Sequence, residues 1–230
     1  MMNPMKESIA RINERIEAAC ARSGRKSDEV TLIAVSKTFP AEVVRQAYDA
    51  GLRIFGENRP QELRDKARLL PEDIEWHFIG HLQTNKIKYV VPRAVLIHSV
   101  DTVHLANALN QFAEKRSLTV PVLLEVNTSG ENTKFGFKPA EVSEAFGSIK
   151  ELKYLQVKGL MTIGPLTDDQ RQIRQAFRTL ANLRETLVSA FPGHALPFLS
   201  MGMSGDFEIA IEEGSTHIRV GTAIFGTRGR

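Results

Sequence analysis

The stretch TLIAVSKTFPAEVVRQAYDAG, residues 31–51, combines one expected strand with one expected helix. Its first six residues, Thr31–Ser36, are mostly apolar, which predicts a strand buried on both faces. Pro40 and Gly51 then mark the start and the stop of a helix. Lys37 lies between the two elements, so a buried strand runs directly into a lysine, and a function for that lysine has to be considered.

The same alternation of strand and helix continues along the chain. Near-continuous apolar runs such as VPVLLEV are typical of parallel strands that are covered on both faces. Strands of this kind are separated for the most part by helix-like segments. The strand candidates are Thr31–Ser36, Arg53–Phe55, Glu75–Ile79, Val95–His98, Val120–Val126, Val157–Ile163, Pro197–Ser200 and His217–Val220.

The intervening segments carry helix start signals. Asp101 is the expected N-cap of the helix after the fourth strand, and Thr167 or Asp168 that of the longest helix. A short helix is expected from about Gly205, and a further helix at about residues 6–23 precedes the first strand.

Eight alternations in one uninterrupted chain predict a (β/α)8 TIM barrel with an extra N-terminal helix. No linker or low-complexity tract divides the sequence, so residues 1–230 are expected to form a single domain. The alternative is an open doubly wound sheet. The strand count and the lack of a Rossmann glycine fingerprint favour the barrel.

Composition excludes several classes of function. The chain of 230 residues has a net charge of +3, scattered Lys and Arg and only 7% aromatic residues, which argues against nucleic-acid binding. No apolar run of 18 residues predicts a membrane span, and the N-terminus lacks the apolar core of a signal peptide. Cys20 is the only cysteine, which fits a reducing cytoplasm.

A barrel of this type carries its site on the loops that follow the strands. The last two such loops, SMGMSGD and VGTAIFG, are the most informative. Ser204, Gly221 and Thr222 supply a hydroxyl and small residues that let backbone N–H groups approach an anion, as expected of a phosphate site. The simpler alternative is that these glycines only serve turns.

Lys37 and Arg219 extend this pocket toward a particular ligand. In a closed barrel the first strand lies beside the eighth, so an aldehyde whose phosphate is held by the last two loops could reach the amine of Lys37. Pyridoxal 5′-phosphate (PLP) carries both groups, and lysine forms Schiff bases with it. Arg219 could then face the pyridine nitrogen. The alternatives are a lysine that extends from the barrel rim into solvent and an arginine that pairs with a nearby carboxylate.

The segments AVSKT, FGEN, WHFIGHLQTNK, GLMTIG, SMGMSGD and RVGTAIFG occur in this order over nearly the whole chain. Together they resemble the pyridoxal phosphate homeostasis protein family, the YggS-type proteins, whose fold is similar to the N-terminal barrel of alanine racemase. The resemblance implies a single PLP-binding barrel that holds the cofactor as a Schiff base. The residues that it implies around the cofactor are Lys37, Asn58, His81, Met203 through a backbone amide, Ser204, Arg219, Gly221 and Thr222.

A carrier and an enzyme remain to be distinguished. Racemisation needs proton delivery to both faces of the substrate carbon. Lys37 could serve one face, but the tyrosines Tyr48, Tyr89 and Tyr154 are expected away from the mouth, and the chain ends within ten residues of the last strand. The expected function is therefore a non-catalytic role in PLP (vitamin B6) and amino-acid homeostasis. The alternatives are a weak PLP-dependent racemase or lyase, and a phosphate-sugar enzyme without PLP.

The expected partners follow from this function. PLP is the small-molecule ligand, PLP-accepting apoenzymes are possible recipients, and neither nucleic acid nor a membrane is expected. The protein is expected to be a cytoplasmic monomer, since the additional domain through which alanine racemase dimerises is not expected here. No metal site is expected, because the histidines lack ligand spacing. Glu57 has two possible roles, a base that faces the ligand or a solvated carboxylate at the rim.

Overall fold

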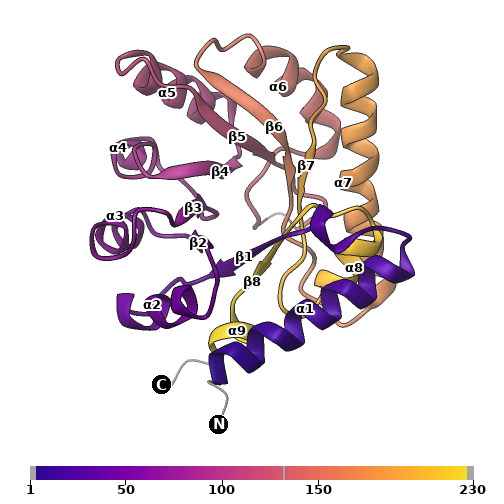
Figure 1. The fold of residues 1–230 in the computed structure, drawn as a ribbon. Helices are drawn as coiled ribbons and strands as arrows, with labels where there is room; N and C mark the ends of the chain where they lie inside the picture. The colour runs from indigo at the N-terminus through magenta and orange to yellow at the C-terminus, as the bar shows by residue number, and fades with distance from the viewer. Residues whose placement is uncertain (1–3, 132, 227–230) are drawn as a thin grey trace.

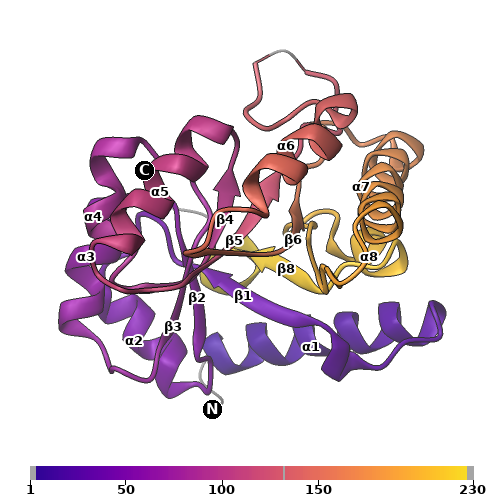
Figure 2. The same ribbon diagram turned by 90° about the horizontal axis from the view of Figure 1, so that it is seen from above.

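A closed barrel of parallel strands forms the centre of the molecule, in the strand order β1 to β8 (Figures 1 and 2). The computed structural model describes residues 4–131 and 133–226. The predicted (β/α)8 barrel is confirmed. Its strands are β1 Thr31–Val35, β2 Ile54–Glu57, β3 Glu75–Phe78, β4 Ala94–Val100, β5 Val120–Glu125, β6 Leu155–Met161, β7 Phe198–Ser200 and β8 His217–Val220.

Helices surround the barrel as an outer layer, as the view from above shows (Figure 2). The long N-terminal helix α1, Pro4–Arg22, precedes the first strand as predicted and contacts α8 and α9. The other helices are α2 Ala41–Asp49, α3 Pro60–Leu69, α4 Ile87–Val90, α5 Val103–Glu114, α6 Val142–Ile149, α7 Gln170–Ala190, α8 Phe207–Glu212 and α9 Thr222–Phe225, with 3-10 turns η1 Ser27–Glu29, η2 Thr84–Lys86 and η3 Pro139–Glu141.

The pairing of β1 with β8 closes the barrel. Leu32 is in register with Ile218, and Ile33 is in register with Arg219. Because parallel strands end at the same edge, this register places the turn after β1 beside the loop after β8. Lys37 and Gly221 therefore come together although they are far apart in the sequence.

The main core lies between the strands and the helices. Phe55 and Phe78 from the strands and Phe146 and Phe177 from the helices are fully buried there. Trp76 is also buried and packs against Phe55, with ring centroids 5.8 Å apart. The alternation of β-strand side chains between the two faces explains this layer, because every second residue points outward to the helices.

Several predicted helix starts were wrong by one or two residues. The N-cap of α5 is Thr102, whose hydroxyl accepts the Leu105 N–H at 3.1 Å, rather than Asp101. The cap of α7 is Asp169, one residue beyond the predicted pair. Helix α8 begins at Phe207 instead of near Gly205. At the starts of α5 and α7, the side chain next to the predicted one accepts a hydrogen bond from a free N–H group. At α8, the N–H groups of Asp206 and Phe207 donate to the Met203 carbonyl in the preceding turn.

No helix in the described part of the chain is long and apolar enough to cross a membrane.

Candidate cofactor pocket at the carboxyl ends of the strands

A cavity of about 460 Å³ opens at the carboxyl ends of the barrel strands. All eight residues that the sequence pointed to lie in its wall. Arg219 comes from β8 itself and the other seven from the loops after β1, β2, β3, β7 and β8, so the closed barrel brings them together. The lining residues are Val35, Lys37, Asn58, Ile79, Gly80, His81, Glu125, Phe135, Ile163, Met203, Ser204, Gly205, Arg219, Gly221 and Thr222.

One side of the cavity is formed by Asn58 and Gly80. These residues approach so closely that a Cβ atom on Gly80 would lie 2.3 Å from the Asn58 carbonyl oxygen and 2.6 Å from its Cα. Only glycine allows this contact. The amide oxygen Oδ1 of Asn58 is buried and has no hydrogen-bond partner among the described residues. A buried polar atom without a partner at a cavity wall indicates a ligand group that completes it.

The loops after β7 and β8, where the sequence predicts an anion site, form another side of the cavity. The hydroxyl oxygen of Ser204 accepts hydrogen bonds from the backbone N–H groups of Gly221 at 3.3 Å and Ala223 at 3.5 Å. These distances are long, so both hydrogen bonds are weak. The N–H of Met203 instead donates to Asp206 at 2.5 Å. The amide that the resemblance assigned to a phosphate is thus bonded to Asp206, while Met203 lies in the cavity wall, and its contact with a phosphate stays a prediction.

Arg219 enters the cavity from within the barrel and is almost fully buried. It donates to the hydroxyl of Ser200 at 2.6 Å and to the Thr162 carbonyl at 2.8 Å. Burial lowers its pKa to about 10, while Glu125 and Asp206 act in the opposite direction. The guanidinium thus stays charged at neutral pH. Among the described residues its hydrogen bonds go to neutral oxygens, and no carboxylate lies close enough to form the ion pair of the alternative interpretation.

Arg219 is hydrogen-bonded to one end of a chain of buried, uncharged side chains. Ser200 lies 2.9 Å from Nδ1 of His98, and Nε2 of His98 lies 2.8 Å from Nδ1 of His77. Burial lowers the pKa of His77 to about 3 and holds that of His98 well below its usual value, so both rings are uncharged. Arg219 is therefore the charged end of a chain that runs down the barrel axis.

His81 stands at the mouth of the cavity, on the loop after β3. Its Nδ1 lies 2.8 Å from the Asp101 carboxylate, and its ring stacks on Phe135 with centroids 3.9 Å apart. Phe135 is 56% exposed although it is aromatic. Asp101 thus orients the imidazole instead of capping α5, which explains why the predicted cap was wrong.

The lining residues that the sequence did not predict include a carboxylate, Glu125, and an aromatic residue, Phe135. Glu125 ends an apolar strand and is only 5% exposed, yet its side chain lies in the cavity wall. Burial raises its pKa to about 7, with Asp101 raising it further and Arg219 lowering it. A charged residue within the run VPVLLEV was the available signal. Phe135 gave none, because a lone aromatic residue in a long loop does not reveal its contacts.

Glu57 fits neither of its two predicted roles. It is fully buried, and its Oε1 lies 2.6 Å from Nζ of Lys66, which projects from α3. It is therefore neither a solvated rim carboxylate nor a residue of the cavity wall. At the end of β2 its side chain points outward to the helix layer.

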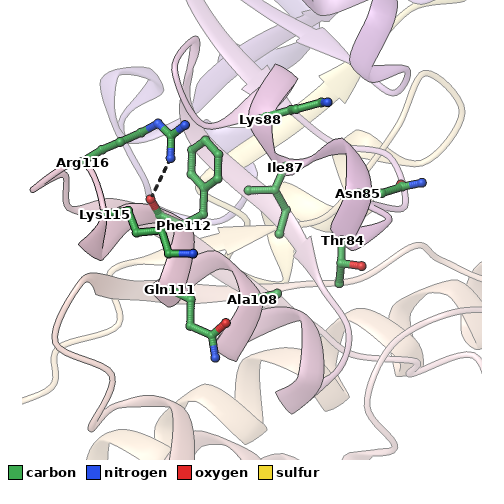
Figure 3. Close-up of a pocket in the computed structure, with 9 residues that line it drawn as sticks. All are labelled: Thr84, Asn85, Ile87, Lys88, Ala108, Gln111, Phe112, Lys115 and Arg116. Atoms are coloured by element: carbon green, nitrogen blue, oxygen red, sulfur yellow. Dashed lines mark hydrogen bonds between the residues drawn. The ribbon is translucent and has the colours of Figure 1, made fainter.

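Other sites in the structure offer less chemistry. A groove of about 430 Å³ lies on the outside of the barrel between η2–α4 and α5, and contains Lys88, Phe112 and Arg116 (Figure 3). None of the predicted site residues is near it. Within residues 4–131 and 133–226, no cluster of three His, Cys, Asp or Glu residues could hold a metal ion.

The fold and the cavity define a class of protein: a (β/α)8 barrel with a lysine, a buried arginine and the loops after β7 and β8 around one pocket. Comparison with known proteins agrees with this class. The family model for the N-terminal domain of alanine racemase matches residues 8–229.

Curated relatives narrow the class. The chain is 48% identical to the pyridoxal phosphate homeostasis protein of Aquifex aeolicus, over 96% of this chain and 97% of that protein. It is 41% identical to the protein of the same name from Escherichia coli K12, over 99% and 98%. The solved structure of PipY from Synechococcus elongatus with PLP bound has a TM-score of 0.81 and 38% identity, covering 94% and 100% of the two chains. The chain belongs to the pyridoxal phosphate homeostasis protein family.

Proposed function

We propose that this protein binds PLP in the cavity at the carboxyl ends of the strands and takes part in the homeostasis of PLP and amino acids. A single observation carries the proposal. The amine of Lys37 and the loops that hold Ser204 and Gly221 line the same cavity, at the point where β1 pairs with β8. PLP carries its aldehyde and its phosphate on one small ring, so a site for PLP needs an amine and an anion site close together.

The residues present fit the two ends of the cofactor. The phosphate would be held by the Ser204 hydroxyl and by the backbone amides of Gly221 and Thr222, with the positive charges of the cavity offsetting its own. Lys37 would attach the aldehyde carbon as a Schiff base, and Asn58, with its unpartnered amide oxygen, would lie close to it. A cavity of about 460 Å³ has room for one such molecule.

Arg219 sets the electronic character of the site. PLP supplies an electron-withdrawing ring that stabilises negative charge on an attached carbon. An arginine donates a proton in its hydrogen bond and does not release it, so it leaves the ring nitrogen unprotonated and the ring a weak electron sink. Hydrogen bonds to the buried hydroxyl of Ser200 and to the carbonyl of Thr162 hold the guanidinium of Arg219 in place. This geometry favours holding the cofactor over carbanion chemistry.

The composition of the cavity wall supports a carrier role. None of the described residues in the cavity wall is a tyrosine: Tyr48 lies in α2, Tyr89 in α4 and Tyr154 just before β6. The second proton donor that a racemase needs is thus not supplied by these side chains. We infer that the protein, acting as one domain over residues 1–230, is a non-catalytic, monomeric, cytoplasmic PLP carrier that passes the cofactor to apoenzymes.

Titration with PLP, followed by visible absorption, tests this function. The wild-type protein should develop a Schiff-base band that saturates at one PLP per chain. Lys37→Ala should remove this band, because the attacking amine is gone. Lys88→Ala, on the outer groove, is the matched control and should behave as the wild type. A wild-type titration that shows only the absorption of free PLP would favour the phosphate-sugar alternative instead.

One observation favours a second candidate function, a weak PLP-dependent racemase or lyase. Glu125 lies in the cavity wall with a pKa raised by burial to about 7, so it could accept and return a proton near neutral pH. The discriminating measurement is turnover of D- and L-amino acids by the pure protein, with Lys37→Ala as the control. Turnover that depends on Lys37 would establish the enzyme and overturn the carrier.

A further inference from the structure

The turn that carries Lys37 is strained. Thr38, the next residue, adopts φ = 67° although it is β-branched. This left-handed conformation is unfavourable for such a residue and costs on the order of 1–3 kcal/mol. It persists only where the surroundings enforce it, and such strain is concentrated at functional sites.

Charged groups behind the turn fix the residue on one side of Lys37. Nζ of Lys66 donates to the backbone carbonyl of Ser36 at 2.8 Å. The hydroxyl of Ser36 donates to Oε1 of Glu57 at 2.7 Å, and this oxygen also accepts from Lys66 at 2.6 Å. Ser36 is therefore held through its main chain and its side chain by a buried ion pair.

A second carboxylate fixes the residue on the other side. Oε2 of Glu62 accepts the Thr38 N–H at 2.6 Å and lies 3.3 Å from Nζ of Lys66. Glu62 and Lys66 are one helical turn apart on α3. One helix thus contacts the chain immediately before and immediately after Lys37.

Stability alone does not account for this arrangement. Lys66 is only 6% exposed, and the second oxygen of Glu57, Oε2, is buried without a hydrogen-bond partner among the described residues. Desolvation of a buried ion pair offsets most of its attraction, so replacing it by apolar side chains is often neutral or stabilising. The network stabilises a strained conformation rather than the fold as a whole.

We propose that Glu62 and Lys66 are positioning residues for Lys37: they hold the main chain on both sides of it so that its amine faces the cofactor cavity. This inference rests on the proposed PLP attachment to Lys37. It assigns to α3, which contributes no residue to the cavity wall, a part in cofactor binding. The ligand that the pair serves is the aldehyde end of PLP.

Three variants of α3 test the proposal by PLP titration. Glu62→Ala removes the acceptor of the Thr38 N–H, and the loss of one charge-assisted hydrogen bond should weaken PLP binding about tenfold. Glu62→Gln keeps an oxygen acceptor at the same reach and should stay within about threefold of wild type. Asp65→Ala changes an exposed carboxylate on the same helix and should leave the affinity unchanged.

A second readout needs no PLP. In the protein without PLP, reductive methylation followed by mass spectrometry measures the reactivity of each lysine. Glu62→Ala should change the rate at Lys37 and leave that at Lys88 unchanged, whereas a general loosening of the fold would change both. If Glu62→Ala does not fold, Glu62→Asp, which keeps the charge but shortens the side chain, replaces it and should weaken PLP binding at least about threefold.

The outcomes separate this inference from the proposed function. Wild-type affinity and unchanged Lys37 reactivity in Glu62→Ala, or wild-type affinity in the substitute Glu62→Asp, would overturn the positioning role while PLP attachment stands. A wild-type protein that forms no Schiff base would overturn the proposed function itself. Weaker PLP binding by Glu62→Ala, together with a methylation rate that changes at Lys37 and not at Lys88, would support the positioning role of Glu62 and Lys66.

Discussion

Gly80 shows how a single residue shapes the cavity. Its missing side chain lets the main chain of Asn58 approach, and any Cβ there would overlap the Asn58 main chain. Backbone atoms cannot move away as the end of a flexible side chain can. The position of Asn58, and with it the wall of the cavity next to Lys37, therefore depends on Gly80 being a glycine.

We expect Gly80→Ala to lower the free energy of unfolding by about 1–3 kcal/mol, the usual cost of overpacking, and to weaken PLP binding. Gly205→Ala is the matched control in the same cavity wall, since a Cβ there meets nothing within 4 Å. Its unfolding free energy should stay within about 0.5 kcal/mol of wild type. Urea unfolding measures both, and equal stability of the two variants would show that Asn58 is free to shift.

Glu125 gives a prediction with a defined sign. Its pKa in the folded protein is about 7, against 4.5 for an unperturbed glutamate, with burial as the main cause. Between these two pH values the folded protein binds the proton and the unfolded chain does not, so stability is lost as the pH rises through 7. Glu125→Gln removes this titration.

The free energy of unfolding of Glu125→Gln relative to wild type should therefore increase from pH 4.5 to pH 8. The increase should be on the order of 3 kcal/mol, because the pKa of Glu125 is raised from 4.5 to about 7. Urea unfolding of both proteins at several pH values measures this difference. A difference that stays constant with pH would mean that Glu125 ionises as an exposed carboxyl does.

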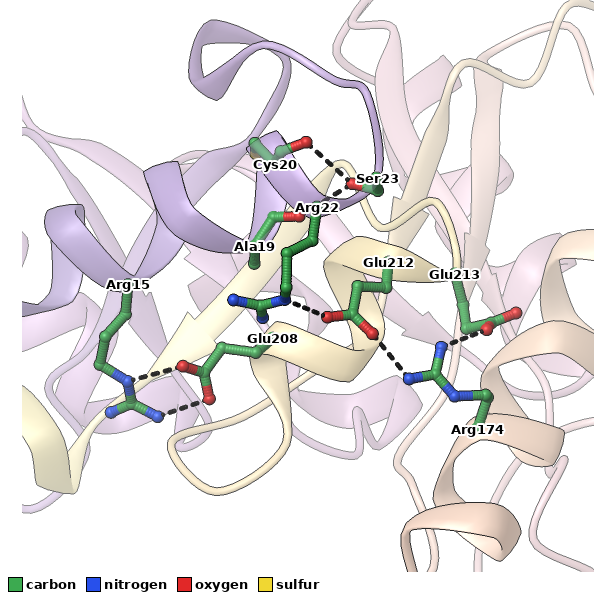
Figure 4. A network of polar contacts seen from close by, with 9 residues as sticks. All are labelled: Arg15, Ala19, Cys20, Arg22, Ser23, Arg174, Glu208, Glu212 and Glu213. Carbon is green, nitrogen blue, oxygen red and sulfur yellow. Dashed lines mark hydrogen bonds and ion pairs between the residues drawn. The ribbon is translucent and has the colours of Figure 1, made fainter.

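At the scale of elements, ion pairs join the N-terminal helix to the end of the barrel (Figure 4). Arg15 of α1 pairs with Glu208 of α8 at 2.9 Å, and Arg22 of α1 pairs with Glu212 at 2.8 Å. Arg174 of α7 pairs with Glu213 at 2.7 Å. Helix α8 follows the loop that contains Ser204, so these contacts anchor one side of the cavity from outside.

The carboxylates of this network should differ in how much each contributes to the free energy of unfolding. The side chain of Glu213 is 9% exposed and accepts from two arginines, whereas that of Glu208 is 33% exposed. We expect Glu213→Gln to cost about 1–2 kcal/mol and Glu208→Gln less than about 1 kcal/mol, because exposed pairs are worth little.

Salt provides the check for these two substitutions. Urea unfolding at low salt and at 1 M salt should show that the cost of Glu208→Gln falls, since screening acts on exposed charges, while that of Glu213→Gln largely remains. Equal costs at both positions, or a Glu213 effect that disappears in salt, would contradict this account.

The sequence predicted most of the elements but not all their limits. Strand β8 matches its prediction, whereas β6 begins two residues earlier than expected, at Leu155. The exposed Gln156 and the polar Lys158 interrupt the apolar pattern there, and Gly159 accompanies a shift in register with β5. Helix α4, four residues long, is too short to show a period.

At the scale of the whole molecule, the eight predicted site residues come together because the barrel closes. Seven of them follow the end of a strand and Arg219 lies within β8, so strand order and the family resemblance together were enough to single them out. The network of Glu57, Glu62 and Lys66 could not be predicted in this way, because it depends on the distance between a helix and a strand end. The stacking of Phe135 on His81 likewise depends on the path of a long loop.

The central claim is that the amine of Lys37 holds the aldehyde of PLP while the last two loops hold its phosphate. Reduction of the PLP-treated protein with borohydride, followed by peptide mass spectrometry, tests it most directly. We expect one pyridoxyl group per chain, attached to Lys37. A stable adduct on a different lysine, or none, would contradict it.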